Sequence, residues 1–260
     1  MLLEHMPAAG MQPDVYSYAA AISACSRASE PDRAISLFKQ MCATDVRPNA
    51  VCFNAALAAC QRMRRHSQLI ALFGAMPAYG VQPDAWAYSS AIDAVARLGQ
   101  WERALELLAD VELAARAGNC APPEQHCYGA AMRACLRERR YDTVLELHER
   151  LRRAGVAPNS HTLAFAIDAA SLRAAAPEGW RPALRLLSSA PEDAASVRCY
   201  AAAARACERA GQWLEAVGLL DEMGERGVRP NAHVYAAAIG AHGAERRWES
   251  ALELLDRLEA

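Results

Sequence analysis

The apolar positions of this chain recur with a period of about 35 residues. An aromatic residue or a leucine marks the same place in every copy, at Tyr18, Phe53, Tyr88, Tyr128, Leu163, Tyr200 and Tyr235. Alanine stands three places and six places after this marker in all seven copies. Residues three apart share one face of an α-helix, so each copy is predicted to begin with a helix whose narrow side lets a neighbouring helix approach closely.

A second amphipathic pattern follows this helix. From Trp101 to Leu108, apolar residues fall at i, i+3, i+4 and i+7, which predicts another helix. An aromatic residue opens this second helix in most copies, at Trp101, Tyr141, Trp180, Trp213 and Trp248. The copies close on turns such as Gly80-Val81-Gln82-Pro83, where glycine suits a left-handed helix end and proline prevents continuation. The Asp or Asn after the proline is predicted to cap the next helix.

One helix–turn–helix unit cannot bury its own apolar face, so such units must stack on one another. The predicted fold class is all-α, a right-handed α-solenoid of helix–turn–helix repeats with a period of about 35 residues. We predict a single array over residues 1–260, with repeats at 15–49, 50–84, 85–124, 125–159, 160–196 and 197–231 and partial repeats at 1–14 and 232–260. The partial repeats lead us to expect a fragment of a longer protein or a truncated gene model.

Two repeats depart from the regular length. The third carries five extra residues around Ala115 to Pro122, which we expect to lengthen the second helix or its turn. The fifth carries about four extra residues between its helices, at Ala174 to Gly179.

The overall charge does not favour a nucleic-acid binder. The formal net charge is −2 and the pI is about 6.4, whereas nucleic-acid-binding proteins more often carry a basic balance. Any such binding must therefore come from the placement of the charges. The uncharged stretch from His66 to Pro83 is interrupted by prolines and glycines, so we expect no membrane span. No targeting peptide is visible at Met1 to His5.

Cysteines and histidines do not form a metal-binding or disulfide pattern. Seven of the nine cysteines fall into two columns of the repeat, and Cys52 and Cys60 lie more than two helical turns apart. No Cys-x-x-Cys or His-Glu-x-x-His occurs. We expect buried free thiols, no metal ion and no cofactor. The sequence also lacks a nucleophile elbow and a phosphate loop, so no catalytic residue is predicted.

The period of 35, the Pro-Asp/Asn-x-x-x-Tyr/Phe opening, the Ala-Leu-Glu-Leu-Leu second helix and the Gly-Val-x-Pro-Asp/Asn close resemble the pentatricopeptide repeat (PPR) family. The resemblance implies a protein that reads single-stranded RNA at one base per repeat. It also implies that the protein is located in an organelle, the chloroplast or the mitochondrion, and acts there in RNA processing, stability, editing or translation. Some members join PPR repeats to a metallonuclease domain, and we expect any catalysis to lie outside these 260 residues.

In the family, two positions per repeat select the base: the residue after the marker and the residue after the closing proline. The resemblance implies base-reading roles for Asn54, Asp84, Ser89, Asn49, Asn159 and Asn231. Asn54 with Asp84 is the combination that implies uridine. Ser89 is paired with Glu124, whereas Asn49, Asn159 and Asn231 are paired with Ala19, Gly129 and Ala201. Helix capping is the alternative role for the Asp and Asn residues.

The resemblance also implies RNA contacts for residues at two further positions of the repeat. Nine places after the marker, at a position that faces phosphate in the family, stand Arg27, Arg62, Arg97, Arg137 and Arg209. Leu172 and Ala244 break this column, and an interaction with the helix dipole is its alternative role. Two places before the marker, at the family's base-stacking position, stand Tyr16, Val51, Trp86, His126, His161, Arg198 and His233. Packing at repeat junctions is the alternative there.

These observations leave two functions open. The first is an RNA-binding module that uses the first-helix face, with single-stranded RNA as partner. The second is a helical-repeat scaffold for a protein partner, which the low net charge and the alanine-rich reader positions favour. The arginine column and the Pro-Asp/Asn close favour RNA. Neither function involves a membrane, a small-molecule substrate or enzymatic activity in this chain.

Overall fold

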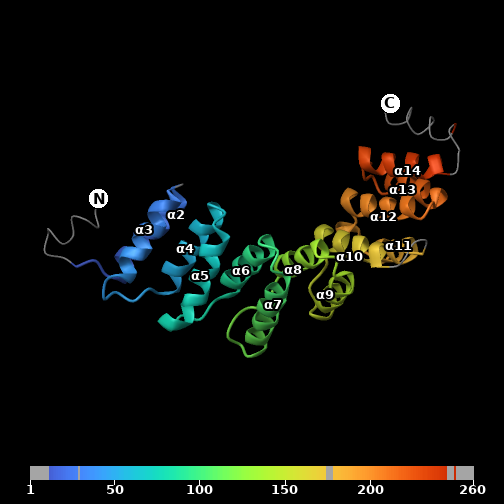
Figure 1. The fold of residues 1–260 in the computed structure, drawn as a ribbon. Helices are drawn as coiled ribbons and strands as arrows, with labels where there is room; N and C mark the ends of the chain where they lie inside the picture. Colours follow the sequence, from blue (N-terminus) through green and yellow to red (C-terminus); the bar gives the residue numbers. More distant parts are fainter. Residues whose placement is uncertain (1–11, 29, 174–177, 245–248, 250–260) are drawn as a thin grey trace. The chain divides into compact units, whose positions relative to one another are not determined.

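The computed structural model describes residues 12–28, 30–173, 178–244 and 249, and this part of the chain is helical with no strand (Figure 1). The first helices of the repeats are α2 (Val15–Arg27), α4 (Ala50–Arg62), α6 (Ala85–Arg97), α8 (Gln125–Arg137), α10 (Ser160–Arg173), α12 (Val197–Arg209) and α14 (Ala232–Ala244). The second helices are α3 (Pro31–Cys42), α5 (His66–Ala75), α7 (Trp101–Arg116), α9 (Tyr141–Arg153), α11 (Trp180–Ser188) and α13 (Trp213–Glu225). Short 3₁₀ turns follow α5 and α11, at η2 (Met76–Tyr79) and η3 (Glu192–Ala194). The predicted fold class is confirmed.

The predicted helix starts are confirmed by side-chain caps. In five first helices an Asp or Asn side chain accepts a hydrogen bond from the backbone N–H three residues later; these are Asp14, Asn49, Asp84, Asn159 and Asn231. The predicted aromatic residues open α7, α9, α11 and α13. Local sequence therefore determines where these helices begin.

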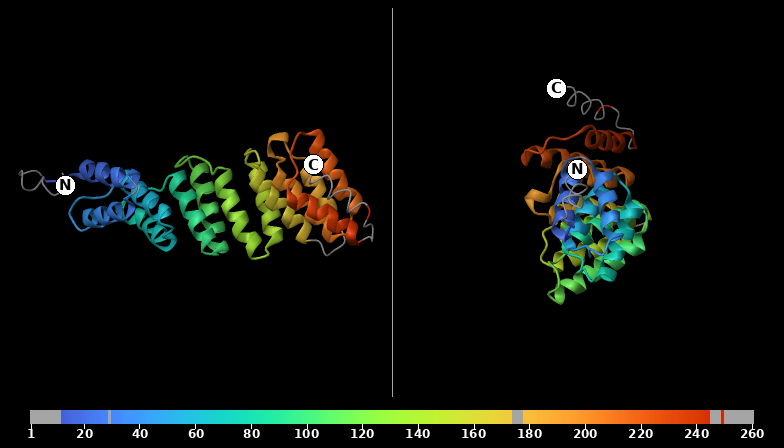
Figure 2. Two further views of the ribbon diagram at one scale, coloured as in Figure 1. Left: turned by 90° about the horizontal axis from the view of Figure 1, so that it is seen from above. Right: turned by 90° about the vertical axis from the view of Figure 1, so that its left-hand side faces the viewer.

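Two compact units make up the chain, Met1–Ala134 and Cys135–Ala260, and the boundary falls inside α8. In the first unit, α2, α4 and α6 stack in order; in the second, α10, α12 and α14 do the same (Figure 2). Second helices pack against the first helix of their own repeat and of the next, as α3 does with α2 and α4. One array over the whole chain stays a prediction, and residues 1–11 and most of those beyond 244 lie outside the described part.

The small-residue side of the first helix is where neighbouring repeats meet. The alanine three places after the marker is buried in six of the seven copies, at Ala56, Ala91, Ala131, Ala166, Ala203 and Ala238. Ala24, from the other alanine column, is exposed on α2, the first helix of the described part. Burial of the alanine column three places after the marker is expected for a solenoid, in which each repeat packs on its neighbour.

Both irregular repeats absorb their extra residues at element ends. Helix α7 has 16 residues, whereas α9 and α13 have 13 each, so the third repeat's insertion lengthens its second helix. In the fifth repeat, α10 ends at Arg173 and α11 begins at Trp180, with residues 174–177 outside the described part. A Cβ on Gly179 would lie 2.4 Å from the carbonyl oxygen of Ser171, so this close approach of two backbones requires glycine.

The cysteines are free thiols, and six are buried: Cys52, Cys60, Cys127, Cys135, Cys199 and Cys207. Burial raises the pKa of the Cys60 thiol to about 11 and that of Cys207 to about 12, so neither is a reactive thiolate at neutral pH. In the described ranges, no three metal-ligating side chains gather at one place. Nor do those ranges contain a helix with the length and apolar character to cross a membrane.

One buried histidine interrupts an apolar column of the core. His148 on α9 is 4% exposed and occupies the repeat position of Phe38, Leu108 and Leu220, which are all buried. Its Nδ1 atom has no hydrogen-bond partner in the described structure. Burial lowers the pKa of His148 from 6.5, because a charged imidazolium is unfavourable in this apolar environment.

We therefore expect acid to destabilise the fold through His148. Below pH 6.5 the unfolded chain binds a proton that the folded chain resists, so stability falls as the pH decreases. His148→Leu should stabilise the protein by about 1 kcal/mol near neutral pH, and by up to about 1.4 kcal/mol more at about pH 5.5. Urea unfolding at about pH 7.5 and about pH 5.5 measures this, with the exposed His126→Leu as control. Equal acid sensitivity of the His148→Leu variant and the wild type would contradict it.

Candidate nucleic-acid interface

The side chains of Asn54 and Asp84 meet although they come from adjacent repeats. Asn54 Nδ2 on α4 donates a hydrogen bond to Asp84 Oδ2 at 2.7 Å, across 30 residues of sequence. The other carboxylate oxygen, Asp84 Oδ1, accepts from the N–H of Ala87 at 2.8 Å and caps α6. Asp84 thus caps α6 and also orients the side chain of Asn54. Because an ionised carboxylate only accepts hydrogen bonds, it holds the NH₂ group of Asn54 toward itself, and Asn54 Oδ1 is buried without a hydrogen-bond partner in the described structure.

The other predicted reading pairs are not joined by side chains. Asn49, Asn159 and Asn231 use their side-chain oxygen to cap α4, α10 and α14. Their partners Ala19, Gly129 and Ala201 offer no polar side chain. Ser89 hydrogen-bonds the buried thiol of Cys127. Among these predicted pairs, a side-chain hydrogen bond joins Asn54 with Asp84.

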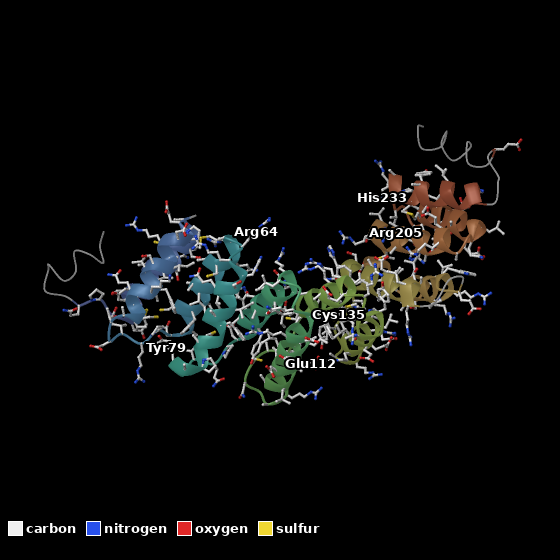
Figure 3. All side chains as sticks on the ribbon, viewed as in Figure 1. Arg64, Tyr79, Glu112, Cys135, Arg205 and His233 are labelled. Carbon is white, nitrogen blue, oxygen red and sulfur yellow. The ribbon has the colours of Figure 1, made fainter. Side chains whose placement is uncertain are left out.

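The column two places before the marker is exposed in all seven repeats, at Tyr16, Val51, Trp86, His126, His161, Arg198 and His233. Tyr16 is 76% exposed, Val51 55% and Trp86 42%, which is unusual for large apolar side chains. Each residue lies in the first turn of a first helix, as His233 does on α14 in Figure 3. Packing at repeat junctions therefore does not account for this column, whereas stacking against a ligand requires such exposure.

The arginine column divides into two groups. Arg27, Arg62 and Arg137 end α2, α4 and α8, and all three are exposed. Within the part of the chain that the structure describes, their side chains make no hydrogen bond or ion pair. Arg97 instead donates from Nε to Asp93 Oδ2 at 2.7 Å, and Arg209 donates to Ser171 Oγ. Three of the five predicted arginines are thus free for an anionic ligand.

A further charged column was not recognised from the sequence. Five places after the marker stand Asp93, Arg133, Asp168 and Arg205 in successive repeats. Asp93 on α6 pairs with Arg133 on α8 at 2.7 Å, and Asp168 on α10 pairs with Arg205 on α12 at 3.0 Å. Figure 3 labels Arg205 on α12. The signal that identifies this column is present in the sequence, because acidic and basic residues alternate at one position of successive repeats.

Asp93 is the most enclosed member of this column, at 4% exposure. Burial acts to raise the pKa of its carboxyl group, but the hydrogen bonds and positive charges of Arg97 and Arg133 together outweigh burial and hold that pKa below its usual value. The carboxylate therefore stays charged between two guanidinium groups.

Comparisons with known proteins identify the repeat. A family profile described as the pentacotripeptide-repeat region of PRORP matches residues 10–179, and a PPR repeat profile matches residues 199–228. Maize PPR10 is 23% identical, with a TM-score of 0.49, over 99% of this chain and 41% of that chain. The PPR domain of Arabidopsis thaliana PRORP1, solved in complex with tRNA, is 23% identical, with a TM-score of 0.53, over 62% of this chain and 82% of that chain.

The nuclear proteinaceous RNase P 2 (PRORP2) of A. thaliana is 15% identical, with a TM-score of 0.59, over 66% of this chain and 38% of that chain. This chain thus spans less than half the length of PPR10 and of PRORP2. A search of curated proteins finds no match.

Proposed function

Because the chain belongs to the pentatricopeptide repeat family, we propose that it binds single-stranded RNA along its first helices. Exposed residues in the first turn of these helices stack on bases, and Arg27, Arg62 and Arg137 at their ends contact phosphates. Phosphate contact is local and independent of the total charge, so a net charge of −2 does not prevent it.

The main observation that supports this proposal is the hydrogen bond between Asn54 and Asp84. With one N–H held by Asp84, the Asn54 amide keeps its second N–H for a ligand, whereas its carbonyl oxygen is buried without a hydrogen-bond partner in the described structure. This N–H can donate a hydrogen bond to a carbonyl oxygen on the edge of uracil. Because the family resemblance implies uridine for an Asn–Asp pair, we assign this repeat to uridine.

The solved PRORP1 domain was crystallised with tRNA, which supports RNA as the class of ligand. We propose a binding role without catalysis for this chain, because its matches lie in the repeat region and cover 38% of the RNase P 2 chain. Its family resemblance supports an organellar role in RNA processing, stability, editing or translation.

Binding of labelled RNA tests the proposal. Fluorescence anisotropy compares oligoadenylates with and without one uridine at about 50 mM and about 200 mM salt. We expect salt-sensitive binding and a preference for the uridine-containing RNA of roughly 5-fold to 10-fold, since one good base contact contributes about 1–3 kcal/mol at most. No binding at the lower salt would favour a protein scaffold instead.

Two matched variants isolate the reading pair. Asp84→Ser keeps a residue type that caps α6 but removes the carboxylate that reaches Asn54, so the uridine preference should be lost while binding persists. Asn49→Ser makes a comparable change at the cap of α4, opposite Ala19, and should leave the preference unchanged. A preserved preference in Asp84→Ser would exclude the assigned reader.

A further inference from the structure

Three columns of the repeat share one ridge of the first helix. The base-reading residue, the charged column and the arginine column lie one, five and nine places after the marker, so neighbours along the ridge are four residues apart. Four residues advance the helix by about 40° beyond one full turn, so the three side chains lie one above another on one face. On α6 these are Ser89, Asp93 and Arg97; on α4 they are Asn54, Ala58 and Arg62.

The charged column therefore lies between the bases and the phosphates of RNA bound on this face. Asp93 uses both carboxylate oxygens there: Oδ2 accepts from Arg97 and Oδ1 accepts from Arg133, each at 2.7 Å. Helix α4 has Ala58 at the same place, and Arg62 has no such counterion within the described ranges. Two adjacent repeats thus differ in whether their arginine is already paired.

The three partners of this cluster differ in exposure. The Asp93 side chain is 5% exposed, whereas those of Arg97 and Arg133 are 49% and 37% exposed. An RNA phosphate can therefore approach the guanidinium groups but not the carboxylate. To bind Arg97 fully, the phosphate must displace a charge-assisted hydrogen bond and remain beside a buried negative charge.

We propose that Asp93 competes with RNA phosphate for Arg97 and Arg133, so that RNA is held tightly at α4 and loosely at α6. The inference rests on the proposed RNA binding. It makes Asp93 a positioning residue that sets affinity without touching RNA. The consequence is an uneven RNA footprint within the first unit, anchored at Arg62 and weak at Arg97.

Two variants of the 260-residue chain test this in opposite directions. Asp93→Asn removes the negative charge and releases two guanidinium groups, so the affinity for single-stranded RNA should rise roughly 3-fold to 10-fold at low salt. The slope of log K against log salt should steepen by about 0.7 for each additional phosphate that the protein neutralises. Ala58→Asp places a carboxylate four residues before Arg62, which should lower the affinity by a similar factor and flatten the slope.

The outcomes separate the inference from the function it rests on. If the wild-type protein does not bind RNA at low salt, both the proposed function and this inference are wrong. Wild-type binding with unchanged affinity and slope in a natively helical Asp93→Asn protein overturns the inference alone and leaves Asp93 as a structural link between α6 and α8. If Asp93→Asn fails to fold, the Ala58→Asp variant is the test, because that substitution breaks no ion pair. A lower affinity for RNA with a flatter slope of log K against log salt supports the inference. An unchanged affinity and slope overturn it.

Discussion

Replacing both Arg27 and Arg62 with glutamate should lower the affinity for single-stranded RNA by about 100-fold at low salt. Both guanidinium groups are exposed, and neither has a side-chain partner among the residues that the structure describes. Charge reversal removes two phosphate contacts and adds two repulsions on the same face. Because the side chains lie at helix ends in solvent, circular dichroism should show unchanged helicity.

A second double variant tests whether RNA binding depends on the position of the arginines or on the total charge of the protein. Arg103 and Arg116 are also exposed, but they lie on the second helix α7, away from the proposed RNA path. Reversing both changes the net charge by the same amount and should weaken binding only slightly. Equal losses in the two double variants would point to overall charge, and full binding by the Arg27/Arg62 variant would favour a protein scaffold.

Replacing Trp86 with alanine should weaken RNA binding about 10-fold, since one stacked base contributes roughly 1–3 kcal/mol. The Trp86 side chain is 42% exposed in the first turn of α6, two residues after the Asp84 cap. It is therefore placed beside the base that the Asn54–Asp84 pair would contact. Its exposure also means that truncation should cost little folding stability.

Two control variants show whether the loss of binding comes from the aromatic ring of Trp86. Trp86→Phe keeps an aromatic face and should retain most of the affinity. Leu113→Ala removes another exposed apolar side chain, 69% exposed on the second helix α7, and should not affect binding. Anisotropy titrations give the affinities, and thermal unfolding checks the fold. A large loss of stability in Trp86→Ala would instead assign this residue to packing.

The sequence by itself determined the repeat, because each feature depends on neighbours close along the chain. Asp84 caps α6 through the N–H of Ala87, three residues on, and Trp101 opens α7 where the pattern predicted. The pairing of Asn54 with Asp84 was predicted from the family resemblance, and the hydrogen bond between them follows because their repeats are consecutive and pack on each other.

Only the tertiary structure decided which side chains are available to a ligand. Arg62 and Arg97 are equivalent in the repeat, yet Arg62 is free among the described residues and Arg97 is bound to Asp93, which Arg133 also reaches from a helix 40 residues further on. Likewise, Trp86 and Trp101 are both aromatic, but the fold exposes the first and leaves the second half-buried. The period specifies which residues share a column, whereas burial and charge pairing depend on how the stacked helices bring columns together.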